Sequence, residues 1–523
     1  MQSSLSVSVE GDGVVGGLVA GQDCSAACQA SFDSTAQVTL VANAGSDSTF
    51  GGWGGDCAGT STVSCIVTMA ANHTVTATFV AAPAPSGRAY YVSSGGSDSA
   101  VGTSVGAPLK TIGRAISLVA AGDVIEVRAG TYGENLYPRT AGTSGAWITL
   151  RGYNGERPVI RGTGSGPTIY FYRDECDEGV IGTGSGNTDC KAMYWTVQGL
   201  DIRGSASGDG DGNAVKIDTP KVKLVGNRIC CSVADVVKLV RTANDVEILD
   251  NEISQDRSIT VPSDNAQAVD IVGADRTRVA GNYVHDMTDF GIYAKGNSRN
   301  TVFENNLLVN IVGNALMLGQ STDADRLADG NYETYDGIIR NNVVVGSGWA
   351  CLASSSSIRA KIYNNSCYNT GTSTHGSILL SNESEVSTPG LDIEIYNNII
   401  YGSANKPILS ITSNAMSDYK TLKIDKNIYY IGGGDPQFSS SDHFGQIGVA
   451  QWRTQYQSLS GRSDTSLVVD PKFAATTGSS ALTLQSTSPA INAGTTNTTV
   501  VPMDRRGVAR PQSGAADIGA YEY

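Results

Sequence analysis

Hydrophobic and polar residues alternate with a period of two in many short segments of this chain. Within the first 80 residues the alternation is clearest at 4–9, 38–42 and 74–79. A strand with one buried and one solvated face has this period, because successive side chains point to opposite faces. The pattern predicts a small all-β domain over residues 1–80.

A turn motif recurs along most of the remaining chain, in which an asparagine is followed by two mostly apolar residues. These asparagines are Asn227, Asn251, Asn282, Asn306, Asn342, Asn365, Asn398 and Asn427. Their spacings are 24, 31, 24, 36, 23, 33 and 29 residues, which suits a coil of three short strands with turns of variable length. A propeller blade needs about 40 residues or more. We therefore expect a solenoid in which each asparagine adopts the left-handed conformation and hydrogen-bonds to adjacent coils.

Both ends of this array differ from its middle, as the ends of a solenoid must if they are to cover open strand edges. Residues 89–132 predict strand, amphipathic helix and strand, and residues 488–522 are expected to close the far end. The apolar stripe of the helix consists of Leu109, Ile112, Ala115, Ile116 and Val119. Residues 81–87 contain two prolines and predict a stiff linker. The predicted domains are therefore 1–80 and 88–523.

Charge and cysteine content narrow the class of protein. The net charge is −14, and without a basic stripe we expect no nucleic-acid partner. No apolar run is long enough for a membrane span, and no signal peptide is visible after Met1. The ten cysteines fall in near pairs, so we expect disulfides and a secreted or cell-surface protein. We also expect a monomer.

Alternation within the coils identifies side chains that point outward. In 268–273, Val269 and Ile271 face the core and Asp270 faces out; in 291–296, Tyr293 and Lys295 face out. Lys238 occupies a similar place one coil before Asp270. Because strands stack about 4.8 Å apart, these four side chains are predicted to share one site.

Two turns beside these strands supply further candidates. An acidic turn contains His285, a candidate catalytic residue, with Asp286 and Asp289. A long insertion and the strand after it contribute candidate substrate-binding residues, and long turns on one side of a solenoid often carry binding sites. These candidates are Asp323, Arg326, Glu333 and Arg340. For Asp323 and Glu333, a solvated loop acid is the alternative reading.

These residue types suit β-elimination of a uronate polysaccharide. The reaction removes the proton α to the substrate carboxylate, so it needs a base and a cation that neutralises the carboxylate. A lysine can be the base, and calcium held by aspartates can bridge to the carboxylate. Because the chain is acidic, a polyanionic substrate would require bound calcium or a local basic patch.

Two resemblances add to these expectations. Residues 53–57 read Gly-flanked Trp-Gly-Gly-Asp-Cys, and 65–69 read Cys-Ile-Val-Thr-Met. This first domain resembles the internalin B-repeat, which implies a spacer or adhesive module in which Trp53 either packs in the core or stacks on a sugar. Residues 88–523 resemble the right-handed parallel β-helix proteins among secreted bacterial carbohydrate-active enzymes.

Residues 264–320 in particular resemble β-helix polysaccharide lyases of the pectate-lyase type. The resemblance implies Lys295 as the base and Asp270, Asp286 and Asp289 as calcium ligands, with Tyr293 protonating the leaving oxygen or forming a subsite wall. The chain departs from that pattern in two places. Its nearest aspartate cluster, 208–212, lies at least two coils away, and Met317 stands where the next coil would carry the lysine.

Two other functions stay open. A glycoside hydrolase on the same fold could use Asp270 with Asp286 or Asp289, and the separation of their carboxylates would then decide between retention and inversion. A non-catalytic surface adhesin is the third possibility, favoured by the N-terminal module.

Overall fold

Alternating segments form short strands throughout the part of the chain that the computed structural model describes. The described residues are 2–11, 13–19, 22–34, 36–44, 48–59, 64–81, 87–172, 192–205, 212–255, 266–322, 327, 331–382 and 388–523. Contacts divide the chain into two compact units. One comprises Met1–Ala84, Pro471–Ala474 and Thr483–Tyr523, and the other Pro85–Asp470 and Ala475–Leu482. The predicted domain ranges 1–80 and 88–523 stay predictions, because the last residues group with the N-terminal ones.

Two four-stranded sheets form the N-terminal module. One has the order β4 (Ala27–Asp33), β1 (Gln2–Glu10), β8 (His73–Ala81), β6 (Ser48–Gly55), and the other β3 (Gln22–Cys24), β2 (Gly13–Val19), β5 (Gln37–Ala44), β7 (Ser64–Thr68). Their inner side chains, such as Leu5, Leu40 and Val75, make one buried cluster. Trp53 is 7% exposed within that cluster beside Cys57 and Cys65. It is therefore a core residue rather than a sugar platform.

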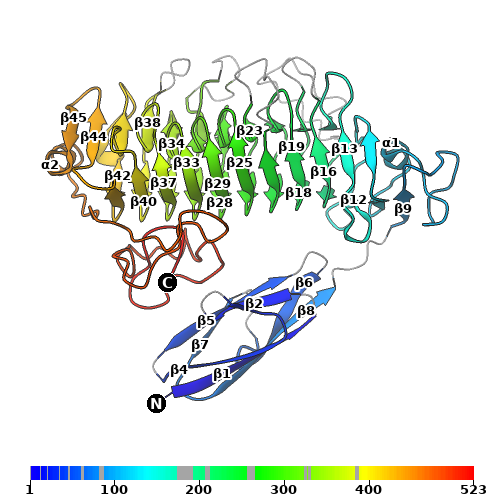
Figure 1. Cartoon of the computed structure of the whole chain (residues 1–523), viewed down its shortest axis with the longest axis horizontal. Helices are drawn as coiled ribbons and strands as arrows, with labels where there is room; N and C mark the ends of the chain where they lie inside the picture. The colour runs from blue at the N-terminus through cyan, green and yellow to red at the C-terminus, as the bar shows by residue number, and fades with distance from the viewer. Residues whose placement is uncertain are drawn as a thin grey trace. The chain divides into compact units, whose positions relative to one another are not determined.

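Pro85–Asp470 forms a parallel β-helix of three long sheets (Figure 1). The first sheet contains β9 (Ala89–Val92), β10 (Val124–Val127), β12 (Ile148–Gly152), β15 (Trp195–Gln198), β18 (Val222–Val225), β21 (Glu247–Leu249), β24 (Arg278–Ala280), β28 (Val302–Glu304), β32 (Ile338–Arg340), β36 (Lys361–Tyr363), β39 (Glu394–Tyr396) and β42 (Lys423–Asp425). The second contains β11 (Thr131–Gly133), β13 (Val159–Arg161), β16 (Asp201–Arg203), β19 (Arg228–Cys230), β22 (Glu252–Ser254), β25 (Tyr283–Met287), β29 (Leu307–Ile311), β33 (Val343–Ser347), β37 (Ser366–Thr370), β40 (Ile399–Gly402) and β43 (Ile428–Tyr430).

The third sheet is the one on which the predicted site falls. It contains β14 (Ile169–Phe171), β17 (Val215–Ile217), β20 (Val237–Val240), β23 (Val269–Val272), β26 (Ile292–Lys295), β30 (Leu316–Leu318), β34 (Leu352–Ser355), β38 (Ile378–Ser381), β41 (Leu409–Ile411), β44 (Gln437–Ser440) and β45 (Gly445–Gly448). A short accessory sheet joins β27 (Ser298–Arg299), β31 (Thr334–Tyr335) and β35 (Ser357–Ile358). The predicted all-β class, with a parallel β-helix and a small N-terminal β domain, is confirmed.

The asparagine ladder lies at the turn between the first and second sheets. Asn282, for example, donates from its backbone N and its Nδ2 to Asn306 Oδ1, both at 3.0 Å, and Asn306 donates in the same way to Asn342. The predicted left-handed conformation, however, belongs to the preceding residue: φ is 59° at Asn305 and 55° at Asn341. This correction explains why Gly, Asp or Asn often precedes the ladder position.

Replacement of Asn306 by alanine is expected to cost about 2–3 kcal/mol of unfolding free energy, because buried donors and acceptors on three coils lose their partners. Asn306 is fully buried and also donates to the Val279 carbonyl. Asn405→Ala is the matched control, since Asn405 is exposed, and should change stability by about 0.5 kcal/mol or less. Urea denaturation of both variants measures the difference. Equal unfolding free energies for the two variants would show that the asparagine ladder does not stabilise the β-helix.

Each end of the β-helix carries a helix (Figure 1). Helix α1 (Ile112–Ile116) packs on β9 and β10, and the predicted apolar stripe is buried. Helix α2 (Val449–Ser460), which the sequence analysis did not predict, places Trp452 against Phe438 of β44, with stacked rings 4.9 Å apart. Thus α2 covers the far end of the coil, and the closing role of residues 488–522 stays a prediction.

Disulfides form at four of the five predicted near pairs. They join Cys24 with Cys28, Cys57 with Cys65, Cys230 with Cys231, and Cys351 with Cys367. The fifth pair, Cys176 and Cys190, lies outside the described residues. The pairing agrees with the oxidising compartment inferred from the cysteine spacing.

Candidate active site

A continuous row of side chains runs along the outer face of the third sheet. Strand pairing places Lys216 beside Lys238, Lys238 beside Asp270, and Asp270 beside Tyr293. Met317 comes next in the row. The residues between them, such as Val269 and Ile292, belong to the core, so the outward direction inferred from alternation is confirmed. Lys238, Asp270 and Tyr293 are thus brought together, and Lys295 lies at the end of the same strand as Tyr293.

Lys238 is held between two carboxylates. Its Nζ donates to Asp235 Oδ2 at 2.8 Å and to Asp270 Oδ2 at 3.0 Å. Burial alone would lower the pKa of this ammonium, but Asp270 and Asp235 outweigh burial and hold its pKa above the usual value. Lys238 therefore stays protonated and serves as a fixed positive charge, not as a base.

Asp235 is a residue that the sequence analysis missed. Its side chain is completely buried and accepts a hydrogen bond from the Gln267 backbone at 3.3 Å. Burial, together with the charge of Asp270, raises the pKa of Asp235 to about 7 even though Lys238 opposes the rise. The signal was present in the sequence, because Asp235 interrupts an apolar run from Val233 to Val237, and a buried acid in such a run needs a partner.

Tyr293 is not accessible to a ligand in this structure. Its side chain is 2% exposed, and its ring packs edge-on against Phe290 with centroids 5.9 Å apart. Burial, reinforced by Asp270 and Asp235, holds the pKa of the phenol well above its usual value. The predicted role of Tyr293 as proton donor to a leaving oxygen is therefore corrected. Tyr293 instead packs beneath the outer surface, against Phe290, and supports the residues of the site.

Lys295 occupies the accessible end of β26. Its Nζ lies 5.3 Å from the centroid of the Tyr293 ring and donates to the Ser321 carbonyl at 3.3 Å. The side chain is partly exposed, and no carboxylate ion pair is recorded for it among the described residues. Of the two lysines predicted to share the site, Lys238 and Lys295, Lys295 is the one better placed to contact a ligand.

Glu333 lies near Lys295 but is fully buried. Its carboxylate accepts hydrogen bonds from Gly296 N at 2.7 Å, from Thr322 N at 2.9 Å and from the Thr322 hydroxyl at 2.8 Å. Burial raises its pKa to about 7, although these hydrogen bonds oppose the rise. Both earlier readings, solvated loop acid and substrate-binding residue, are corrected, because Glu333 instead fixes the turn that follows β26.

His285 and Asp286 belong to the second sheet and not to the row. His285 stacks on Tyr283 with centroids 4.4 Å apart, and its ring nitrogens face Asp286 at 2.9 Å and Glu252 at 3.4 Å. Asp286 also accepts from Asn310. The predicted grouping of His285 with Lys295 is therefore not observed, because β25 and β26 are strands of different sheets.

The three predicted calcium ligands do not come together. Asp270 pairs with Lys238, Asp289 accepts from Gln267 Nε2 at 2.5 Å, and Asp286 faces His285. Among the described residues, no group of three His, Cys, Asp or Glu side chains is placed to hold a metal. The predicted set therefore does not fit a calcium ion, and the aspartates at 209 and 211 lie outside the described residues.

The remaining substrate-binding candidates are separated from the row. Arg340 lies on β32 of the first sheet, where its Nε donates to Glu304 at 2.7 Å, and Glu304 also binds Arg278. Its assignment to the substrate site is corrected for that reason. Asp323 and Arg326 lie outside the described residues.

An aromatic and cationic surface precedes Lys238 in the row and was also missed. Tyr170 and Tyr172 contact each other with ring centroids 5.1 Å apart, and Lys216 Nζ lies 5.1 Å from the Tyr170 ring. Tyr170 donates to Asp218 at 3.0 Å. These side chains are partly exposed, so they offer aromatic rings and a cation on the same outer face.

Comparison with known proteins agrees with this architecture. Residues 10–83 match the divergent InlB B-repeat domain, and residues 94–138 match a family described as a protein of unknown function, DUF1565. The crystal structure of pectate lyase Pel9A superposes with a TM-score of 0.54 at 15% identity, covering 83% of this chain and 96% of that one. The predicted resemblance to the B-repeat and to the β-helix fold is confirmed.

Two curated relatives share shorter stretches with the chain. Pectate lyase PEL9 of Emericella nidulans is 34% identical over 117 residues, which is 21% of this chain and 27% of that protein. The uncharacterized protein YwoF of Bacillus subtilis is 33% identical over 127 residues, or 23% of this chain and 27% of the relative. The chain thus matches about a quarter of the length of each. In the described residues, no helix has the length and apolarity to cross a membrane.

Proposed function

We propose that this protein is a polysaccharide lyase that cleaves a uronic-acid-containing polysaccharide by β-elimination on the outer face of the third sheet. The observation that carries the proposal is Lys295, a partly exposed amine on that face, one coil from Asp270 and two coils from Lys238, the lysine that pairs with Asp270. The Pel9A fold and the local match to a pectate lyase support the same reaction.

In this proposal Lys295 is the base. Its amine nitrogen takes the proton α to the substrate carboxylate, the electron pair forms a carbon–carbon double bond, and the bond to the leaving oxygen breaks. The leaving oxygen takes a proton from solvent, because Tyr293 is buried. Lys238, kept protonated by its two aspartates, holds Asp270 in place beside the strand of Lys295, and Lys216 is placed to bind a carboxylate of the substrate.

The setting of the enzyme follows from the rest of the chain. Four disulfides favour an oxidising compartment, so we infer secretion or exposure at the cell surface. The B-repeat-like module then acts as a spacer or adhesive element. An acidic polysaccharide is the only partner that the proposal requires.

The test is to incubate the protein with uronate and neutral polysaccharides, with and without chelator, and to follow ultraviolet absorbance of the unsaturated product. Lys295→Ala is expected to lower kcat about 100-fold or more, as loss of a general base does. Lys295→Arg keeps the charge but cannot accept a proton, so it should be equally inactive. Lys423→Ala, on the first sheet in a pair with Glu394 at 2.7 Å, is the control and should be fully active.

Other outcomes would contradict the proposal in distinct ways. Full activity in Lys295→Ala would refute the base assignment. New reducing ends without the unsaturated product would indicate a glycoside hydrolase, and inactivity on every glycan would leave the adhesin.

Glycoside hydrolysis is the second candidate because of Asp235. Burial raises the pKa of Asp235 to about 7, and a carboxyl with a raised pKa beside a second carboxyl is the combination from which an acid and base pair is built. Asp235 and Asp270 bind opposite sides of the same ammonium, but both are buried, so the lyase is favoured.

A further inference from the structure

Glu333 lies where three segments of the β-helix meet. It directly precedes β31, and β31 pairs with β27, the short strand that follows the turn after Lys295. Its backbone N donates to the Ser356 carbonyl of the next coil at 2.8 Å, and its side chain is fully buried. The place of Glu333 is therefore set by its backbone, independently of the contacts that its carboxylate makes.

The carboxylate of Glu333 joins the two segments that contact Lys295. Its Oε2 accepts from the backbone N of Gly296, the residue directly after Lys295, at 2.7 Å. The same oxygen accepts from the Thr322 hydroxyl at 2.8 Å, and Oε1 accepts from Thr322 N at 2.9 Å. Thr322 directly follows Ser321, whose carbonyl accepts from Lys295 Nζ. One buried carboxylate thus holds both the turn after Lys295 and the segment that its amine contacts.

The Ser321 side of this arrangement depends most on Glu333. The backbone of Lys295 is also fixed by other contacts, because its carbonyl accepts from Gly273 N at 2.9 Å and from the Ser298 hydroxyl at 2.7 Å. Ser321, by contrast, is exposed, and the buried Thr322 beside it is held by its two hydrogen bonds to Glu333. Loss of those two bonds would free the carbonyl that orients the Lys295 amine.

All three groups that face the Glu333 carboxylate act as donors, two of them backbone N–H groups and one a hydroxyl. An ionised carboxylate accepts from all three, whereas a protonated carboxyl carries a hydrogen that needs an acceptor of its own. Protonation therefore weakens the hold of one oxygen on its donors, and buried donors that lose a partner cost free energy. Burial raises the pKa of Glu333 to about 7, although the three hydrogen bonds and Lys295 oppose the rise.

Few charges act on Glu333 from the elements around it. Lys295 of β26 is the charged side chain that favours the ionised carboxylate. The other titratable groups of the surrounding described strands make contacts among themselves, and they are Tyr332, Tyr335, Arg299, Asp336 and Arg359. Burial, the three donors and Lys295 therefore decide the state of the Glu333 carboxyl.

We propose that Glu333 is a positioning residue for the lyase reaction and makes the site sensitive to pH. Its ionised carboxylate holds the turn at Gly296 and the segment of Ser321 and Thr322, and so orients the amine of Lys295. A proton taken up from solvent by this carboxylate loosens the Thr322 segment, and the amine is then misplaced. This inference rests on the proposed lyase function and specifies how the same site is regulated.

The first experiment compares the pH profile of kcat for the parent protein with that of Glu333→Gln, on the uronate polymer that yields the most unsaturated product. Glutamine keeps the shape, but its amide nitrogen is a donor, so the variant imitates the protonated carboxyl at every pH. The ratio of parent to variant kcat cancels the titration of groups that both proteins share, including Lys295. It is expected to be about 10–100 well above pH 7, as for a misplaced catalytic group, and to approach one well below pH 7.

KM should hardly differ between the two proteins, because the buried Glu333 does not contact the substrate. A ratio of kcat values that is the same at every pH would overturn the inference and leave the lyase intact. Glu134→Gln is the matched control, since Glu134 also accepts from two backbone N–H groups, those of Ile112 and Gly113 at 3.0 and 2.9 Å, but belongs to the α1 end of the β-helix. Its pH profile should be that of the parent.

Two further measurements keep the inference testable if Glu333→Gln folds poorly or if no polymer is cleaved. Thr322→Val removes only the hydroxyl and should lower kcat several-fold with an unchanged KM, whereas full kcat would contradict the role of Thr322. Hydrogen exchange of residues 294–322, corrected for its intrinsic pH dependence, needs no substrate. Protection in the parent should fall as pH drops through about 7, and constant protection would refute the switch. Absence of unsaturated product with the expected change in protection would overturn the proposed lyase alone.

Discussion

Replacement of Lys238 by alanine is expected to lower the free energy of unfolding by about 3–5 kcal/mol, because removal of one partner leaves buried charge without compensation. Asp235 is fully buried and Asp270 is 2% exposed. Within the described part of the chain, Lys238 is the only cation that pairs with either carboxylate. Activity on the polysaccharide should be lost as well, since Asp270 lies beside β26, the strand that carries Lys295, and this part of the sheet would rearrange.

The pH dependence of this loss has a definite sign. Without Lys238, the pKa of Asp235 in the folded state rises further above that of the unfolded chain, because Lys238 is the cation that opposes burial. A raised folded-state pKa contributes stability at low pH that is lost as pH rises through that pKa. The variant should therefore approach the parent protein near pH 4 and fall furthest below it above pH 7.

Lys223→Ala is the matched control for this experiment. Lys223 also forms an ion pair with a strand neighbour, Glu247 at 2.9 Å, but both side chains are about one-third exposed. An exposed pair contributes little, so a loss of less than about 1 kcal/mol is expected. Urea denaturation at several pH values measures both variants. Equal losses in the two would show that the Lys238 cluster is not the buried network described above.

The solenoid could be predicted because its signals are local and repeated. Alternation fixed which side chains face the core at Val269 and Ile292, and the asparagine spacing fixed the coil period. Disulfide pairing followed from close spacing for the same reason. None of these inferences required knowledge of how distant turns fold over the sheets.

The candidate site was harder to predict, because it depends on what covers the outer face. Outward direction was correct for Tyr293, yet Phe290 from the preceding turn buries it. Glu333 was indistinguishable in sequence from a loop acid, and only its contacts with Gly296 and Thr322 show that it is internal. His285 was assigned to the site by closeness in sequence, whereas a β-helix places consecutive strands on different sheets.

Which residues of neighbouring strands lie side by side is hard to predict for a related reason. Lys216 precedes Asn227 by the same number of residues as Lys295 precedes Asn306, so a count back from the ladder asparagines would put both lysines in one row, but strand pairing places Lys216 in the row of Lys238. The number of residues between the third sheet and the ladder varies with each turn, so the count is not constant. Pairing between neighbouring strands, which sequence spacing does not reveal, decides the row.

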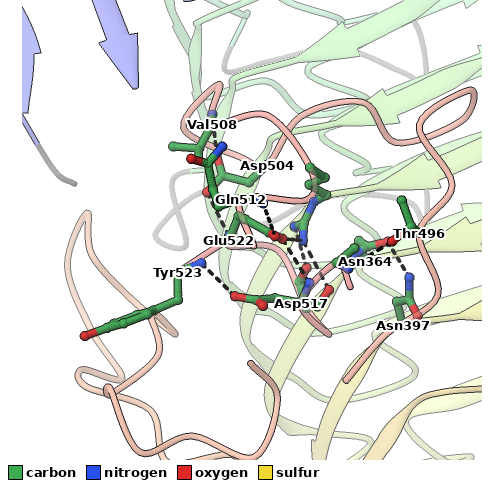
Figure 2. Close-up of polar contacts among 12 residues, drawn as sticks. Asn364, Asn397, Thr496, Asp504, Val508, Gln512, Asp517, Glu522 and Tyr523 are labelled. Atoms are coloured by element: carbon green, nitrogen blue, oxygen red, sulfur yellow. Dashed lines mark hydrogen bonds and ion pairs between the residues drawn. The ribbon is translucent and has the colours of Figure 1, made fainter. Parts of the chain in front are cut away.

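Loss of the Glu522 side chain is expected to have an effect as large as that of Lys238→Ala, because Arg510 would remain buried without its carboxylate. Arg510 and Glu522 are each 1% exposed and lie 2.7 Å apart. Figure 2 shows the contacts of Glu522 within the C-terminal segment, where it also accepts from Gln512 N and Asp517 N. Burial already lowers the pKa of Arg510, which Glu522 chiefly opposes.

Glu522→Ala should therefore cost about 3–5 kcal/mol in the C-terminal segment, with much faster hydrogen exchange and proteolysis of residues 488–523. Asp336→Ala is the control, because it removes the carboxylate of an exposed ion pair in which Arg359 is 44% and Asp336 41% accessible. It should change the local stability of residues 488–523, as either method measures it, by no more than about 1 kcal/mol. If exchange in residues 488–523 were the same in both variants, the buried pair would not be what orders this segment. Since few regular elements hold these residues, their order depends on such side-chain contacts far more than that of the coils does.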